Sequence, residues 1–361
     1  MDSLTQIVLG GAVAAAVIPA RHRRAGLVAG AALGTLPDLD SLLLLAFSGG
    51  DPVILMTMHR GFSHSLFVLP IVAWIIWWIF RRRGGRVAQA PTRWFWAILL
   101  ALMTHPLLDA FTVYGTQLWW PLSLPPVMWS SVFIVDPGYT VWLLLACVIA
   151  WCARERRFAQ YALVAGLCLS SAYLGMSLIV KHQIERAAEQ SLTAMGLIDA
   201  PRFSVPLPLN TVLWRVVAMT PDGYVIGDRS WIADRGPMQF KAFSSATDVL
   251  VEVQQFPSVR RLTWFNHGFM RTQVHEDEVI LSDLRMGFEP DYTFNFAVAM
   301  RDGEHWREIT PRQLQNTYRF PVSGGQWEPV LAALWRRIWH PSDHLLLELG
   351  TVLADDDGTV R

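Results

Sequence analysis

The chain has 361 residues, of which 52% are hydrophobic, and it contains 17 tryptophans. This composition is more apolar than that of an ordinary soluble enzyme, and it predicts a membrane protein with a soluble part. Lys and Arg number 30, as do Asp and Glu, so the net charge is zero and a general affinity for nucleic acid is not indicated.

Six apolar segments occupy the first half of the chain, at residues 7–20, 25–47, 65–80, 94–113, 140–153 and 158–180. Because a helix needs about 20 residues to cross a bilayer, the short ones predict tilted, broken or re-entrant segments. The first is preceded by Asp2 and followed by RHRR, the reverse of a secretory signal, so it is interpreted as a retained membrane segment.

Arginine clusters predict the orientation. They lie at residues 21–24, 81–86 and 154–157, in the first, third and fifth connections. Since positively charged connections stay in the cytoplasm, the other connections and everything after residue 181 are expected outside.

The second half has the pattern of a helix followed by strands. Residues 182–195 form an amphipathic pattern. Beyond them, apolar runs separated by turn signals predict strands. The strands are expected at TVLWRVVAM, GYVIGDRSW, DVLVEVQQF, VRRLTWFN, VILSDLRM and YTFNFAVAM.

The predicted fold class is an α-helical polytopic membrane domain, with about six segments, some of them short or broken, followed by a β-rich extracytoplasmic domain. The membrane domain is expected over 1–181, a helical linker over 182–199 and the β-rich domain over 200–361. Within the last part, strands are expected to about residue 325 and a helical tail around 327–348.

Ionisable side chains of several segments are expected at one depth. Counting about 1.5 Å per helical residue from the nearest arginine cluster puts Asp38 at about 21 Å, His105 at about 18 Å, Asp109 at about 24 Å and His64 at about 26 Å. In a hydrocarbon core of roughly 30 Å, these groups share a layer in the outer half. Ionisable groups so deep in a membrane are costly and usually mark function.

The segment GTLPDLDSLL places Asp38 and Asp40 inside an apolar run. Pro37 breaks the helix and frees backbone groups that only a cavity or neighbouring protein can satisfy. Two carboxylates there favour a ligand role. The alternative is a turn between two short helices in which Asp40 is an N-cap.

The stretch HRGFSH carries His59 and His64, which are five residues apart and do not share a helical face, so a loop is expected. Arg60 between them suits an anionic phosphate or carboxylate oxygen. The alternative is an interfacial loop that caps the next helix.

In THPLLDAFTVYGTQ, His105 and Asp109 are four residues apart and lie on one helical face, a common arrangement for two ligands of one metal. A hydrogen-bonded His–Asp pair that fixes two helices is the alternative. Asp136 in VDPGYT and Gln6 in DSLTQ are weaker candidates, and Asp136 also fits an ordinary turn.

The three cysteines lie in apolar runs and form no CxxC motif, so the candidate donors are oxygen and imidazole. Such donors suit a divalent cation, Zn²⁺ foremost, with Mn²⁺ or Fe²⁺ as alternatives. A bound cation would acidify water and polarise a phosphoryl or carbonyl oxygen.

The motifs DSLTQ, LPDLD, HRGFSHS, THPLLDAFTVYGTQ and DP, in this order, resemble the YdjM/DUF457 family of bacterial inner-membrane proteins, and its longer YfhP-type members most of all. The resemblance covers about residues 1–181 and implies a membrane-bound metal-dependent hydrolase. It also implies a distant similarity to zinc phospholipase C and P1 nuclease, whose sites contain a His-x-x-x-Asp pair. On that pattern His105 and Asp109 are ligands, with Asp38, His59 and His64 beside them. Gln6 stands where relatives often have His.

The leading hypothesis is a multi-pass inner-membrane hydrolase, surrounded by membrane lipids, that uses metal-activated water at the outer face. Arg60 and Asp40 are the catalytic candidates, and a site within the membrane favours a lipid-like ester or phosphoester. One alternative is an ion or proton pathway, although no ionisable groups continue to the cytoplasmic side. The other is a non-catalytic protein with a structural metal and an extracytoplasmic interaction domain. The metal ligands of the leading hypothesis are Asp38, Asp40, His59, His64, His105 and Asp109.

Overall fold

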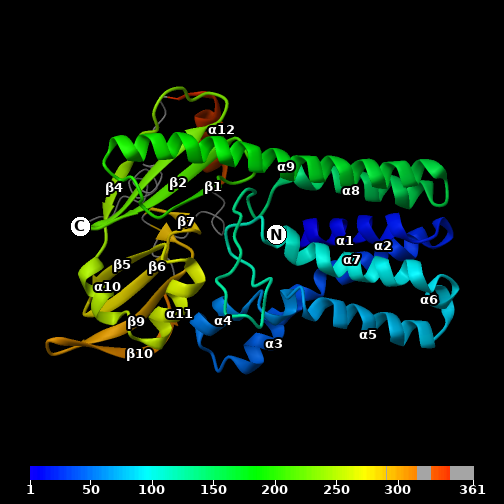
Figure 1. Ribbon diagram of the computed structural model, residues 1–361, viewed down its shortest axis with the longest axis horizontal. Coiled ribbons are helices and arrows are strands. Elements are labelled where there is room, and N and C mark those ends of the chain that lie inside the picture. The colour runs from blue at the N-terminus through cyan, green and yellow to red at the C-terminus, as the bar shows by residue number, and fades with distance from the viewer. Residues whose placement is uncertain (290, 315–326, 342–361) are drawn as a thin grey trace. The chain divides into compact units, whose positions relative to one another are not determined.

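The chain folds into two compact units (Figure 1). The computed structural model describes residues 1–289, 291–314 and 327–341, with backbone alone at 291 and 327–330. The helical unit comprises Met1–Gly50, Thr57–Leu178 and Pro208–Asn210. The sheet unit comprises Asp51–Met56, Ile179–Leu207 and the chain from Thr211 onward.

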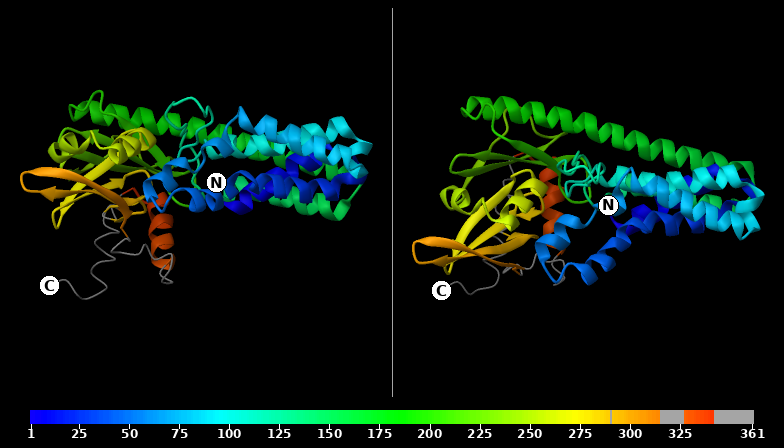
Figure 2. Two further views of the ribbon diagram at one scale, coloured as in Figure 1. Left: turned by 90° about the horizontal axis from the view of Figure 1, so that it is seen from below. Right: turned by 60° about the horizontal axis from the view of Figure 1, so that its bottom comes forward.

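Long helices lie side by side in the helical unit (Figures 1 and 2). Helices cover most of each of the six predicted apolar ranges. They are α1 Ser3–Val17, α2 Arg23–Thr35, α3 Asp40–Phe47, α5 Val68–Arg82, α7 Pro91–Asp109, α8 Pro137–Ala153 and the first part of α9 Arg157–Ala194. The short helix α6, Gly85–Gln89, lies in the connection between α5 and α7. Single 3-10 turns lie at Ala20–His22, Pro37–Leu39 and Phe62–His64.

Among the described residues, two helical stretches are long and apolar enough to cross a membrane, Ala20–Phe47 and Arg157–Ala194. A third candidate is the pair Pro52–His64 and Val68–Arg82, which is bent by 57°. The prediction of a helical region with apolar spans, some of them broken, is therefore confirmed. Six membrane crossings remain a prediction.

The backbones of α1 and α2 touch at glycines. Gly26, Gly30 and Gly34 follow one another at intervals of four and form one stripe on α2. A Cβ at Gly30 would lie 2.1 Å from the carbonyl oxygen of Gly10, and one at Gly34 would lie 2.4 Å from that of Gln6. Such stripes of small residues let membrane helices approach closely. This contact brings the first turn of α1 beside the end of α2.

Two side-chain contacts join the three basic connections. Arg23 donates through Nη1 to the carbonyl oxygens of Arg154 and Arg156. His22 Nε2 lies 3.1 Å from Gln89 Oε1. The turns α1–α2, α5–α7 and α8–α9 therefore gather at one end of the helical unit, as the positive-inside argument requires.

Two four-stranded antiparallel sheets form the sheet unit. The first has the order β1-β2-β3-β4 and the second the order β10-β9-β6-β5, and a short pair, β7-β8, stands apart. The first sheet contains β1 Arg202–Pro206, β2 Leu213–Thr220, β3 Gly223–Ser230 and β4 Lys241–Ser244. The others are β5 Met270–His275, β6 Glu278–Asp283, β7 Gly287–Phe288, β8 Asp291–Tyr292, β9 Asn295–Asp302 and β10 His305–Gln313.

Helices flank these sheets. The last turns of α9 pack Val180, Ile184 and Ala188 against Trp214 and Val216 of β2. The helix α12, Trp327–Trp339, packs on β2 and β3. The predicted helix at 182–195 is thus present, but it continues the preceding apolar helix without a break. Of the predicted tail around 327–348, residues 342–348 lie outside the described part, as do residues 315–325 of the predicted strand region.

Two predicted strands are wrong. DVLVEVQQF and VRRLTWFN instead contain α10 Thr247–Val253 and α11 Pro257–Asn266. In α11 the buried side chains Val259, Leu262 and Phe265 recur every three residues, which is a helical spacing, and Pro257 occupies the first turn, where its missing N–H costs nothing. The β-rich character of this half is nevertheless confirmed by ten strands among the described residues.

The helix α4, Pro52–Met58, is divided between the units, because Asp51–Met56 cluster with the sheet unit. Asp51 caps it, since its Oδ1 accepts from the amides of Val53 and Ile54 at 2.8 and 3.2 Å. Burial lowers the pKa of Arg261 on α11, and the carboxylate of Asp51 offsets part of that shift. The chain just before HRGFSH is therefore held in the sheet unit.

Candidate metal centre

Four side chains from distant parts of the chain converge in the helical unit. They are Asp38, His64, His105 and Asp109, and one donor atom of each lies within 4.8 Å of the other three. Asp38 lies in the turn after α2 and His64 in the turn before α5, while His105 and Asp109 occupy the last turns of α7. The side chains of all but Asp38 are completely buried, and that of Asp38 is 28% exposed.

The spacing of the donor atoms matches one small cation. The two Nε2 atoms of His64 and His105 are 3.1 Å apart. Asp38 Oδ1 lies 3.4 and 3.3 Å from them, and Asp109 Oδ2 lies 3.3 and 3.6 Å from them. Ligands at 2.0–2.1 Å from a tetrahedral Zn²⁺ are about 3.3 Å apart. The five separations that involve an imidazole nitrogen therefore match the spacing around such an ion.

Hydrogen bonds outside the group orient both imidazoles. His105 Nδ1 donates to the carbonyl oxygen of Gly34 at 2.6 Å. His64 Nδ1 lies 2.8 Å from Ser63 Oγ, which itself donates to Asp40 Oδ2 at 2.6 Å and can therefore only accept from His64. A neutral ring that donates from Nδ1 keeps its lone pair on Nε2. Both Nε2 lone pairs thus point into the group.

The group therefore consists of acceptors. Among the residues that the structure describes, the buried Asp38 Oδ1 and Asp109 Oδ2 have no hydrogen-bond partner. Two positively charged groups contact Asp109: Arg60, whose Nε lies 3.0 Å from Oδ2, and the amino group of Met1, which donates to Oδ1. Buried acceptors that lack a donor are expensive, and two carboxylates with two imidazole lone pairs are a donor set that suits a divalent cation.

Hydrogen bonds to the second carboxylate oxygen of Asp109 orient its Oδ2 toward the group. Its Oδ1 accepts from Gln6 Nε2 at 2.9 Å and from the amino group of Met1. Gln6 also reaches the carbonyl oxygen of His105 at 3.4 Å. The structure thus gives Gln6 a supporting contact with a candidate ligand through its amide nitrogen.

Asp40 and His59 lie beside the group instead of in it. Asp40 accepts from His59 Nδ1 at 2.8 Å and from the Arg60 amide at 3.1 Å, in addition to Ser63. Its nearer contact with His64 is 4.0 Å, to Nδ1, the nitrogen that faces away from the other donors. Asp40 therefore ties together the loop that carries His64, and these two predicted ligands are not among the converging donors.

Arg60 points its guanidinium at the group. The side chain is buried, its Nη1 donates to Thr112 Oγ1 at 3.1 Å, and its guanidinium carbon lies 4.9 Å from the centre of the Tyr114 ring. The carbonyl oxygen of Arg60 accepts from the Gln117 amide at 3.0 Å. Arg60 thus balances the charge of Asp109 and joins the two motif loops.

Asp136 is the N-cap of α8. Its Oδ1 accepts from the amides of Gly138 and Tyr139 at 3.0 and 3.3 Å, and the Tyr173 hydroxyl donates to it at 2.9 Å. The turn interpretation explains these contacts, and Asp136 is not in the converging group.

The sequence did not predict the contacts that Gly34 and Ser63 make with the two imidazoles. The glycine stripe of α2 was the available signal for Gly34.

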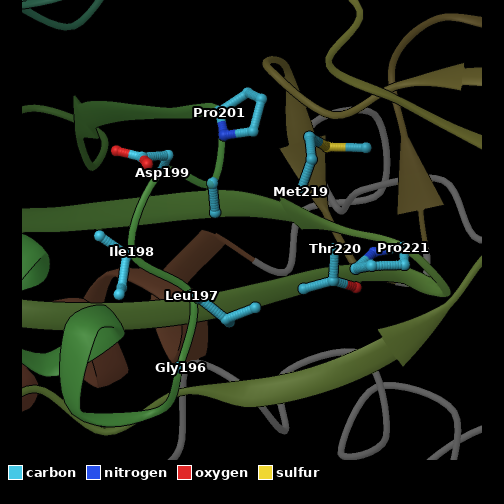
Figure 3. Close-up of a pocket in the computed structure, with 9 residues that line it drawn as sticks. Gly196, Leu197, Ile198, Asp199, Pro201, Met219, Thr220 and Pro221 are labelled. Carbon is cyan, nitrogen blue, oxygen red and sulfur yellow. The ribbon is translucent and has the colours of Figure 1, made fainter.

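A hollow lies in the sheet unit between Gly196–Pro201 and Met219–Pro221, with a volume of about 380 Å³ (Figure 3). Its lining contains one ionisable side chain, Asp199. One carboxylate with no converging partner supports no particular chemistry, so the metal centre remains the candidate functional site.

The fold and the site define a helical membrane protein with a candidate metal centre and an added β-rich part. The sequence model of the YdjM inner membrane protein family matches residues 1–184, and the chain belongs to that family. All four converging residues lie within this match.

Two curated proteins are similar to the chain. One is the uncharacterized protein YfhP of Bacillus subtilis (strain 168), which is 24% identical over 242 residues, 63% of this chain and 68% of that protein. The other is the inner membrane protein YbcI of Escherichia coli (strain K12), 33% identical over 118 residues, 32% of this chain and 60% of that protein. No solved structure matches the chain.

Proposed function

We propose that this protein is a metal-dependent hydrolase of the inner membrane, with a divalent cation held by Asp38, His64, His105 and Asp109. One observation supports the cation above all. The two imidazole Nε2 atoms lie 3.1 Å from each other and 3.3–3.6 Å from each of two buried carboxylate oxygens, and neither oxygen has a hydrogen-bond partner among the described residues. Zn²⁺ fits these donors and their spacing, and Mn²⁺ or Fe²⁺ are the alternatives.

A bound divalent cation supplies Lewis acidity, which polarises a phosphoryl or carbonyl oxygen and acidifies water. The protein contributes charge and orientation. Gly34 and Ser63 fix the two rings, and Arg60 neutralises part of the charge of Asp109. With a dication bound, the two carboxylates and Arg60 leave a net positive charge. The centre then favours substrates with an anionic or ester head group.

The surroundings of the exposed carboxylate indicate the rest of the substrate. Asp38 is the only partly exposed side chain of the four candidate ligands, and its chain neighbours Leu36, Leu39 and Leu42 are exposed. An apolar border next to a charged centre suits an amphiphile whose head group reaches the cation and whose chain stays in the lipid. The basic turns at the opposite end of the helical unit support a site at the outer face of the membrane.

Elemental analysis tests the metal. Purified full-length protein should carry a divalent cation, and His105→Ala should lose it. Asp136→Asn is the matched control, because Asp136 is a buried carboxylate outside the group. A wild-type protein without metal after growth and purification in metal-replete medium would contradict the centre itself.

Activity is tested separately. A panel of lipid phosphoesters and carboxylic esters should be hydrolysed by the wild type, and a chelator should abolish turnover that added metal restores. A metal-loaded protein that is inert on the whole panel would reject the hydrolase and leave the metal site standing.

A structural metal is the second candidate function, in which the β-rich unit serves as an interaction domain. Four protein donors within 4.8 Å of one another, with three of the side chains completely buried, are typical of structural sites, whereas catalytic sites keep one position open. The two differ in the consequence of His105→Ala. A structural metal predicts a large loss of thermal stability and no turnover in the wild type.

A further inference from the structure

The helix α12 has two apolar faces. One face packs into the sheet unit, where Ala333, Leu334 and Ile338 join the core with Leu207 and Leu213. Arg337 on this side pairs with Asp234 at 2.6 Å. This packing fixes the rotation of α12 about its axis, so the direction of its opposite face is also fixed.

The opposite face presents large apolar side chains. Leu331, Trp335 and Trp339 are spaced by four residues and form one ridge. The two tryptophan side chains are 64% and 51% exposed, and their rings lie 5.7 Å apart. Two adjacent exposed tryptophans on a folded unit mark an interaction surface. Arg336, also exposed, lies beside them.

The position of α12 in the sheet unit indicates what its exposed face contacts. Along α9, Val180 and Ile184 pack beside Trp214, near the start of β2, whereas Leu192 packs beside Ala218, farther along the same strand. The start of β2 therefore lies at the end where α9 arrives from its apolar span. Trp231, just after β3, donates to Gln183 near that end at 2.7 Å.

The helix α12 lies at this same end. It packs on Leu213, the first residue of β2, and its Ile338 carbonyl accepts from Ser230 Oγ at 2.7 Å. Ser230 is the residue of β3 that pairs with Leu213. The α12 ridge therefore belongs to the end of the sheet unit that is nearest to the apolar span of α9.

We propose that α12 is an interfacial helix that lies on the bilayer surface. Leu331, Trp335 and Trp339 insert at the level of the lipid head groups, and Arg336 contacts lipid phosphates. Tryptophans together with basic residues are the usual composition of helices that bind a membrane surface. This contact gives the sheet unit a second attachment to the membrane besides α9, and it does not depend on the proposed hydrolase activity.

The test uses the full chain in nanodiscs of phosphatidylethanolamine and phosphatidylglycerol, with the three native cysteines replaced by serine. Leu331→Cys carries an environment-sensitive fluorophore, so both tryptophans remain. We expect a blue-shifted emission and quenching by phospholipids that bear a spin label near the head group. Val251→Cys, at a residue of α10 that is 63% exposed in the same unit, is the matched control and should stay in water.

A double charge substitution tests whether the quenching depends on the two tryptophans. Trp335→Glu together with Trp339→Glu, in the labelled chain, should abolish the quenching. If Leu331→Cys does not fold, as judged by gel filtration and circular dichroism, Trp335→Cys replaces it. An unshifted, unquenched label overturns the proposal. So does a blue-shifted label that the lipid does not quench, because another segment or a second copy of the chain then covers the ridge.

Discussion

At the residue scale, each imidazole of the centre is oriented by a bond on its far side. Gly34 does this for His105 through its backbone, and Asp40 does it for His64 through Ser63. Such outer contacts fix the tautomer and raise the basicity of a ligand. Asp40 can therefore support the candidate metal site by orienting His64, without being a ligand itself.

Asp40→Asn tests this distinction. We expect the variant to bind metal at unchanged stoichiometry with an affinity about 10–100-fold lower, because the amide holds Ser63 and the loop less well than the carboxylate. Competition with a chromogenic chelator measures the affinity, and Asp136→Asn should leave it unchanged. Complete loss of metal, as expected for His105→Ala, would instead make Asp40 a ligand.

Two buried tyrosines of the sheet unit predict an alkaline limit of its stability. Burial, reinforced by the nearby charge of Glu289, raises the pKa of Tyr224 and Tyr292 above the ordinary value. A group whose pKa is raised in the folded state stabilises fully below its unfolded pKa, about 10 for tyrosine, and loses that contribution as the pH rises further. Denaturation followed by near-ultraviolet circular dichroism should show stability falling above about pH 10. Tyr292→Phe should weaken this dependence, and an equally steep loss in that variant would contradict it.

Residue spacing predicted part of the centre. The interval of four between His105 and Asp109 places both on one helical face, which is a local property of a helix. The choice between Asp38 and Asp40, or between His59 and His64, depends on how two turns face each other across the bundle. That tertiary arrangement has no local signature, and the sequence therefore predicted six ligands where four donors converge.

At the element scale, the glycine stripe of α2 sets the geometry of the centre. Gly30→Ala should force α1 and α2 apart, because the new methyl group would lie 2.1 Å from the carbonyl oxygen of Gly10. We expect a loss of about 1–3 kcal/mol in stability, the usual cost of overpacking. Metal retention should fall as well, because Gln6 and Gly34 shift with these helices.

Gly175→Ala is the control for this substitution. Gly175 is a helical glycine whose added Cβ would meet nothing within 4 Å. Thermal unfolding in nanodiscs should show little change or a slight gain, since alanine favours a helix more than glycine does. Equal destabilisation by both substitutions would mean that helix contact is not the cause.

The sequence predicted helix or strand correctly where the apolar residues followed one dominant spacing. The apolar ranges became helices, and GYVIGDRSW became β3. VRRLTWFN combines β-branched and aromatic residues, which favour a strand, with an apolar interval of three, which favours a helix. Packing of Val259, Leu262 and Phe265 in the core decided for the helix, and propensity could not anticipate that.

At the scale of the whole molecule, the sheet unit includes part of the chain that lies between two of the candidate ligands. The family match ends at residue 184, but Asp51–Met56, between two of the ligands, cluster with the sheet unit. A chain cut after residue 184 should therefore bind metal more weakly than the full chain, because Asp51–Met56 lose the unit with which they cluster and Asp51 loses Arg261. Equilibrium dialysis measures this, and Arg261→Ala in the full chain should shift affinity in the same direction. Equal affinities of cut and full chains would show that α4 is held by the helical unit alone.

The division of α4 also bears on how the protein matures. All four donor residues leave the ribosome before Arg261 is translated. A nascent chain therefore has its complete donor set while the helix in front of HRGFSH still lacks its neighbours. On the proposed function, a cation can therefore bind before the β-rich half, with which the start of α4 clusters, has been translated.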